Sequence, residues 1–161
     1  SGSTTTVSID NCFTSTFRNY FITLEDLSIT NSSSKLQFGF RTGGGSGSAG
    51  GNNMGGALQG YLGNDSALTE TAVNVGVVTI MTPTYQNDDF ALQMWVFSPQ
   101  ASSERSTISG RSVYREGSTS NVGFNDFGFM SISTETHTGF TIKSNSANFN
   151  AGGKIKVYGI N

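Results

Sequence analysis

The residues that could support covalent catalysis are few and lie far apart in the sequence. His137 is the only histidine, and its surroundings, STETHTGF, predict an exposed turn between strands. Cys12 is the only cysteine, and the strand-like run around it favours a buried free thiol. No Gly-x-Ser-x-Gly elbow precedes a predicted helix. We therefore expect neither a hydrolytic triad nor any other enzyme activity.

The acidic residues do not form a pattern typical of a glycosidase or of a metal centre. Glu25–Asp26 and Asp88–Asp89 are adjacent pairs, and neighbours in a strand point to opposite faces of the sheet. The run from Asn87 to Asp89 ends a loop, or supplies calcium ligands, but it lacks the spacing of a dedicated calcium loop. One His and one Cys leave little for a transition metal. We predict no bound metal and no cofactor.

Glycan binding is a chemistry that the residues allow. Sugar sites combine aromatic faces with Asn, Asp, Arg and Gln side chains on loops or on a sheet face. The candidate ligand-binding residues are Tyr61, Tyr85, Asp88, Arg105, Arg111 and Tyr114. The arginines among them, and Arg115, are equally well explained as solvated residues on a strand face. Trp95 is a further aromatic candidate, but it lies with Phe97 in FALQMWVF, where packing in the core or between chains is the default. We therefore assign Trp95 and Phe97 to a candidate oligomer interface.

Composition narrows the partners and the fold class. The nine Lys and Arg residues are scattered and the net charge is −2, so we expect no nucleic-acid binding. No stretch approaches the roughly 20 apolar residues of a membrane span, so we expect no membrane insertion. Nearly half of the residues are Gly, Ser, Thr or Asn, and Phe is abundant. This composition is typical of short strands with aromatic interiors that are joined by small polar turns.

Alternating apolar positions predict strands along most of the chain. The expected strands are Phe17–Leu27, Lys35–Arg41, Asn74–Met81, Phe90–Phe97, Ser106–Arg115, Gly123–Ile132, Gly139–Lys143 and Lys154–Ile160. Phe90–Phe97 is apolar in both alternating sets of residues, which predicts a strand covered on both sides. The best candidate for a helical turn is Asn64–Ala72. Eight to ten short strands favour an antiparallel β-sandwich of jelly-roll type, in a single domain over residues 1–161.

The Gly-rich run Gly43–Gly56 stands apart from these strands. It predicts a flexible surface loop, because glycine loses the most conformational freedom on ordering. The alternative is a loop that becomes ordered on contact with a partner chain or a ligand.

Several runs of residues follow one another in a recognisable order. The first run contains Phe13, Thr14, Ser15, Phe17, Tyr20 and Ile22. The strand Leu36–Arg41 and a Gly-rich stretch follow, and a later strand ends in the turn Val96–Pro99. The last run contains Gly153, Ile155, Val157, Tyr158 and Gly159. In this order the runs resemble a recurrent module of tailed-phage virion proteins, including phages of marine bacteria and cyanobacteria. The resemblance extends from Cys12 to Ile160, and the long Gly-rich run and the region Asn64–Asp89 depart from it.

The resemblance implies a virion β-sandwich domain that carries no catalytic residues. It places the domain at the tip of a tail fibre or on the capsid as a head fibre or knob, where it contacts the host surface. Fibres of this kind commonly form homotrimers that attach to other virion proteins, and a host surface glycan is the expected ligand. The alternatives are a capsid decoration protein and a carbohydrate-binding module of a secreted glycanase. The sequence begins with Ser1 rather than Met, which is compatible with its being the C-terminal part of a longer chain.

Overall fold

The protein is built from strands, with no helix in the part of the chain that the structure describes. The computed structural model describes residues 4–31, 34–42, 54–61, 67–75, 77–81, 89–115 and 122–161. These ranges contain eleven strands: β1 (Thr6–Ile9), β2 (Asn19–Leu27), β3 (Leu36–Arg41), β4 (Met54–Tyr61), β5 (Ala67–Val75), β6 (Val78–Met81), β7 (Phe90–Phe97), β8 (Thr107–Arg115), β9 (Val122–Ser131), β10 (Gly139–Ser144) and β11 (Lys154–Ile160).

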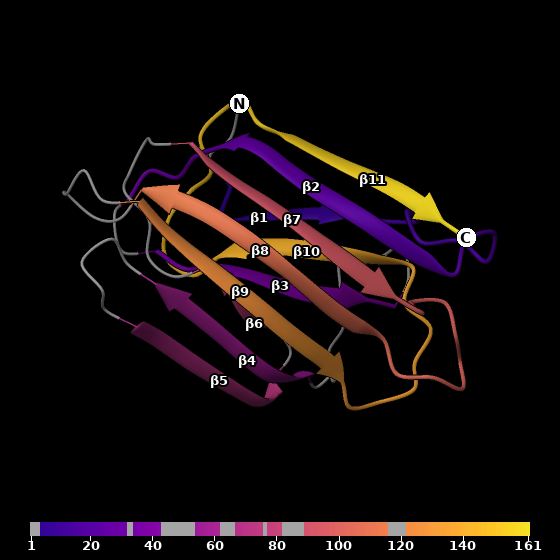
Figure 1. The fold of residues 1–161 in the computed structure, drawn as a ribbon. Coiled ribbons are helices and arrows are strands. Elements are labelled where there is room, and N and C mark those ends of the chain that lie inside the picture. The colour runs from indigo at the N-terminus through magenta and orange to yellow at the C-terminus, as the bar shows by residue number, and fades with distance from the viewer. Residues whose placement is uncertain are drawn as a thin grey trace.

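The strands form two antiparallel sheets that pack together as a sandwich. The small sheet has four strands in the order β1-β10-β3-β6, and the large sheet has seven in the order β11-β2-β7-β8-β9-β4-β5. Figure 1 looks onto the outer face of the large sheet, with the small sheet behind it. The predicted all-β sandwich is therefore confirmed.

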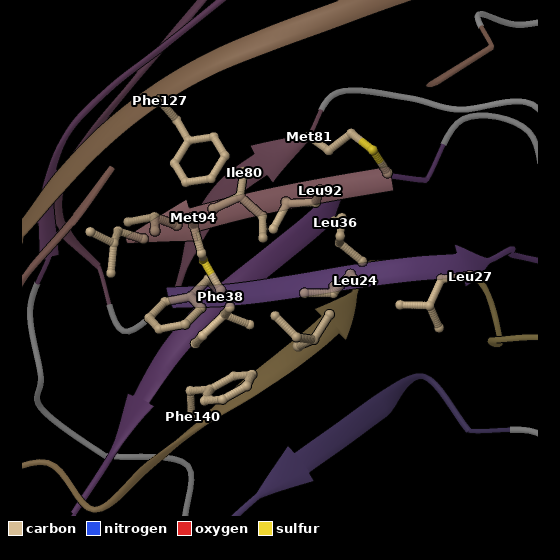
Figure 2. Close-up of a cluster of buried hydrophobic side chains, with 14 of the residues drawn as sticks. Leu24, Leu27, Leu36, Phe38, Ile80, Met81, Leu92, Met94, Phe127 and Phe140 are labelled. Atoms are coloured by element: carbon tan, nitrogen blue, oxygen red, sulfur yellow. The ribbon is translucent and has the colours of Figure 1, made fainter. Parts of the chain in front are cut away.

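The core lies between the two sheets because the strands alternate in polarity. Leu36, Phe38 and Phe40 of β3 are buried, as the alternation predicts. Figure 2 shows Phe38 and Phe140 of the small sheet close to Leu24 of the large sheet, and the two phenyl rings are stacked with centroids 5.6 Å apart. Each such buried side chain contributes about 1.5–3 kcal/mol. A slip of one residue in strand pairing would turn these side chains outward, so the core also sets the register.

Three strand predictions differ from the structure. The described residues hold eleven strands rather than eight to ten, because β1, β4 and β5 were not among the eight predicted strands. The segment Asn64–Ala72, expected as a helical turn, enters β5 at Ala67. The run Asn74–Met81 is not one strand, since β5 ends at Val75 and β6 begins at Val78 in the other sheet. β1 and β6 pair with strands far away in the sequence, and β5 pairs with the preceding strand β4, so strand pairing outweighs the local signal.

The jelly-roll strand order stays a prediction. A jelly roll has eight strands in two sheets, whereas the sheets here have four and seven strands. The hairpin-connected strands β7, β8 and β9 lie side by side in the large sheet, and β11 adds an edge strand beside β2. Of the Gly-rich run, residues 43–53 lie outside the described residues, and Met54–Gly56 begin β4 instead of belonging to a loop.

Candidate functional site

The outer face of the large sheet carries large apolar side chains that the core does not use. In β7 the buried side chains alternate with exposed ones, and the exposed set includes Gln93, Trp95 and Phe97. Trp95 is 42% exposed and Phe97 is 39% exposed. The prediction that both sides of β7 are covered is therefore wrong within one chain, where only the inner set is covered.

Aromatic side chains line up across three neighbouring strands of this face. Tyr158 of β11 pairs with Phe21 of β2, and Phe21 pairs with Trp95 of β7. The ring centroids of Phe21 and Trp95 are 5.0 Å apart, and those of Phe21 and Tyr158 are 6.4 Å apart. Cross-strand aromatic pairs stabilise a sheet, so this row is held in place. We call Tyr158, Phe21 and Trp95 the aromatic ridge.

Small residues continue the same row beyond Trp95. Trp95 pairs with Ser109 of β8, and Ser109 pairs with Gly128 of β9. A Cβ atom added at Gly128 would meet no atom within 4 Å, so the space above this glycine is open. Glycine inside a strand weakens it and often marks a site where another group approaches closely. Trp95 therefore stands beside a floor that is almost free of side chains.

Phe21 and Trp95 of the aromatic ridge, together with this floor, border a hollow of about 760 Å³, which we call the outer groove. Its volume is in the range of ligand-binding clefts. It is lined by Phe21, Gln93, Trp95, Ser109, Gly110, Arg111, Asp126, Phe127 and Gly128.

An ion pair forms the polar wall of the outer groove. The guanidinium group of Arg111 donates to both carboxylate oxygens of Asp126, through Nε at 2.6 Å and Nη2 at 2.8 Å. These hydrogen bonds lower the pKa of Asp126 and raise the pKa of Arg111, so both groups stay charged near neutral pH. Arg111 also lies over the ring of Phe124, 5.5 Å from its centroid. An exposed pair of this kind adds little stability, but its bidentate geometry fixes the donors and acceptors that face the groove.

The structure brings one of the predicted ligand-binding residues into this site. Arg111 lines the outer groove. Tyr114 is buried on the inner face of β8 with 2% exposure and does not line the outer groove, and its role as a ligand contact stays a prediction. Arg105 is exposed in the loop before β8 and does not line the groove. Tyr61 has its backbone in β4, but its side chain lies outside what the structure describes, and Tyr85 and Asp88 lie outside the described residues.

Sequence reasoning missed Phe21, Gln93, Asp126 and Gly128 as groove residues. The sequence held a signal for Gly128, because an isolated Gly inside a strand pattern indicates a site where another group approaches the backbone closely. The others become neighbours of Trp95 only through strand pairing. The role of Trp95 and Phe97 in an oligomer interface stays a prediction.

His137 is not in an exposed turn as predicted but is fully buried. Its ring stacks on Phe40 with centroids 4.3 Å apart, and its backbone N–H donates to the carbonyl of Pro99 at 2.7 Å. Nδ1 lies 2.9 Å from Oγ of Ser106, which donates to the carbonyl of Ser98. Burial lowers the pKa of His137 to about 4. The Ser106–His137 pair is thus neutral and enclosed, with both residues fully buried.

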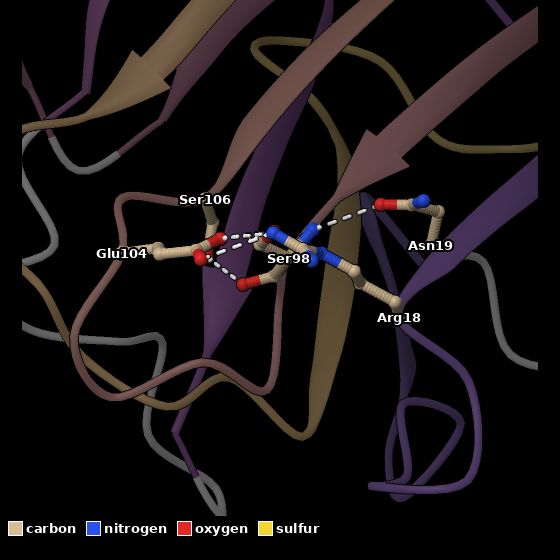
Figure 3. Close-up of polar contacts among 5 residues, drawn as sticks. All are labelled: Arg18, Asn19, Ser98, Glu104 and Ser106. Atoms are coloured by element: carbon tan, nitrogen blue, oxygen red, sulfur yellow. Dashed lines mark hydrogen bonds and ion pairs between the residues drawn. The ribbon is translucent and has the colours of Figure 1, made fainter. Parts of the chain in front are cut away.

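The loop beside this pair is held by a polar network, shown in Figure 3. Ser98 follows β7 with a φ of 51°, and its backbone N–H donates to the carbonyl of Arg18 at 3.1 Å. Its hydroxyl donates to Glu104 at 2.7 Å, and Arg18 bonds the same carboxylate at 3.0 Å. These contacts, led by the Ser98 hydrogen bond, lower the pKa of Glu104. The network joins the turn at Ser98 to Glu104 and Arg18, and so fixes the loop that leads into β8.

The part of the chain that the structure describes shows neither a metal centre nor a membrane-spanning helix. No group of three or more His, Cys, Asp or Glu side chains there is arranged to hold a metal ion. None of the described segments forms a helix able to span a membrane. The half-buried thiol of Cys12 contacts the carbonyl of Ile9 at 3.7 Å, and burial raises its pKa to about 11, which makes it a poor nucleophile.

Comparisons with known proteins add no assignment to this geometry. No protein-family model matches the chain, and a search of curated proteins finds no match.

Proposed function

We propose that this chain is a non-catalytic adhesive domain that binds a surface glycan in the outer groove. The observation that supports this most is the exposed indole of Trp95 beside the open floor at Gly128. A sugar ring presents C–H bonds on its faces and hydroxyl groups around its rim. Its face fits against an indole while its hydroxyls reach Arg111 and Asp126. A mixed lining of this kind suits a sugar better than a purely apolar ligand.

The resemblance to phage appendage modules supports a virion as the location of this domain. In that role it is a fibre tip or a head-fibre knob that contacts the host surface, within a homotrimer attached to other virion proteins. A capsid decoration protein needs a surface that binds the shell, and that role does not itself require a groove with an open floor. A carbohydrate-binding module of a secreted glycanase would use the same groove, and the neighbouring genes would separate that alternative from a virion protein.

Two substitutions test whether the outer groove binds glycans. Trp95→Ala removes the stacking surface, and Gly128→Leu fills the floor from a position with free space for a side chain. We expect each variant to bind at least about tenfold more weakly to any glycan that the wild-type protein binds on an array. Tyr158→Ala is the matched control, because Tyr158 is an exposed aromatic residue of the same face outside the groove lining.

The result that contradicts the proposal is equally specific. Wild-type affinity in both groove variants, with circular dichroism showing intact folds, would place glycan binding elsewhere. Attachment to capsid shells without any glycan binding would favour the decoration role instead.

A further inference from the structure

The outer groove continues along β7 through two further hollows. One hollow, of about 320 Å³, shares Gln93 and Arg111 with the outer groove. The next, of about 490 Å³, shares Ala91 and Val113 with the second hollow. Trp95 and Ala91 are four residues apart on one strand, which corresponds to about 13 Å of path. A path of this length is longer than one sugar ring, so it suits several linked units.

Gln93 of β7 pairs with Arg111 of β8, so a ligand that follows this path passes over these two side chains between the first hollow and the second. The Phe21 and Trp95 rings border the outer groove on one side, and the Arg111–Asp126 pair borders it on the other. Farther along, Glu25 of β2 and Val113 of β8 stand on opposite sides of Ala91. A branch on the ligand would meet these walls.

The charges along the path do not form a cationic surface. Arg111 is already bonded twice by Asp126. Glu25 is also paired, because it accepts from Nζ of Lys156 at 2.9 and 2.6 Å. A carboxylate or sulfate on a ligand would have to compete with Asp126 for Arg111 and would be repelled by the acids farther along. The described charged groups that line the path are four carboxylates, of Glu25, Asp26, Asp89 and Asp126, and two guanidinium groups, of Arg111 and Arg115.

We propose that the outer groove and its continuation along β7 bind an unbranched, uncharged polysaccharide segment and select against acidic polymers. This inference rests on the glycan-binding function proposed above and adds the ligand class and the direction of binding. Uncharged hydroxyl groups can accept from Arg111 and donate to Asp126 without separating the pair.

The experiment compares binding to uncharged and acidic polymers. Amylose, dextran, pullulan, linear mannan and linear galactan serve as uncharged probes, and alginate and polygalacturonate as acidic ones. We expect binding to at least one uncharged polymer, with a change of less than about twofold when NaCl rises from about 50 mM to about 500 mM. Hexasaccharides of that polymer should bind at least about tenfold more tightly than disaccharides, because only the longer chain fills the path.

A gain of binding provides the sharpest control. Asp126→Asn removes the carboxylate that neutralises Arg111, so this variant should acquire alginate binding that weakens as salt is added. The double variant Arg111→Gln/Asp126→Asn lacks both charges, so it should not acquire alginate binding.

The possible failures are distinguishable. If the wild-type protein binds alginate and Trp95→Ala abolishes that binding, the glycan-binding function stands and the proposed selection against acidic polymers is overturned. Equal affinity for disaccharides and hexasaccharides would overturn the extended path. Absence of binding to every probe, uncharged or acidic, would count against the glycan-binding function itself.

Discussion

The burial of His137 makes the stability of the domain depend on pH between about 4 and 6.5. In the folded protein the pKa of His137 is lowered from 6.5 to about 4, mainly because burial disfavours the charged ring. The unfolded chain therefore binds a proton near pH 6.5, whereas the folded chain binds it only near pH 4. Because the unfolded state binds more protons in this interval, the free energy of unfolding falls as the pH falls. Above pH 6.5 both states are neutral at this residue and the effect vanishes.

The size of the effect follows from the two pKa values. One pKa unit corresponds to about 1.4 kcal/mol, so the full difference amounts to about 3 kcal/mol once the pH is below 4. At pH 5 the unfolded chain is almost fully protonated and the folded chain is not, which gives a loss of about 2 kcal/mol relative to pH 8. This is a large fraction of the 5–15 kcal/mol by which domains are typically stable.

Urea unfolding at pH 8 and at pH 5 measures this loss. His137 is the only histidine, so no other side chain of its type titrates in the interval. The comparison variant is His137→Asn, whose amide can replace the contact of Nδ1 with Ser106 and does not titrate. The variant will be less stable at pH 8 because it loses the stacking on Phe40. Its further loss on going to pH 5 should be smaller than that of the wild type by about 2 kcal/mol. Equal losses in the two proteins would refute the assignment of this pH dependence to His137.

Three further outcomes are expected. Asp10→Asn should lower the free energy of unfolding by about 2 kcal/mol in urea titrations, because Nε of the buried Arg41 donates to Asp10 at 2.6 Å. Asp126→Asn removes a carboxylate from an exposed ion pair, so it should change the free energy of unfolding by less than about 0.5 kcal/mol. Equal effects of the two substitutions would contradict this difference between buried and exposed pairs. Gly110→Ala should lower the melting temperature by several degrees, since the added Cβ would lie against the backbone of β7, whereas Gly128→Ala should leave it unchanged or raise it. Light scattering at high concentration should give the mass of a homotrimer, and the mass of a single chain would contradict that assembly.

The sequence predicts the core more completely than it predicts the candidate site. Alternation in Leu36–Arg41 and in Lys154–Ile160 identifies the inward and outward side chains of those strands, because one set is apolar and the other is not. In Phe90–Phe97 both sets are apolar, so the sequence leaves open which of them faces the core. Local spacing also offers no basis for predicting that the turn containing His137 folds inward onto Phe40.

The sequence by itself determined that the chain is an all-β sandwich, since polarity that alternates every second residue needs only local backbone geometry. Tertiary structure alone decided that Trp95 faces outward and that Tyr114 does not. It also decided that Trp95 meets Ser109 and Gly128 across strands β7, β8 and β9. The physical reason is that register depends on which apolar set the opposite sheet buries, and that choice is made by contacts between residues far apart in the chain.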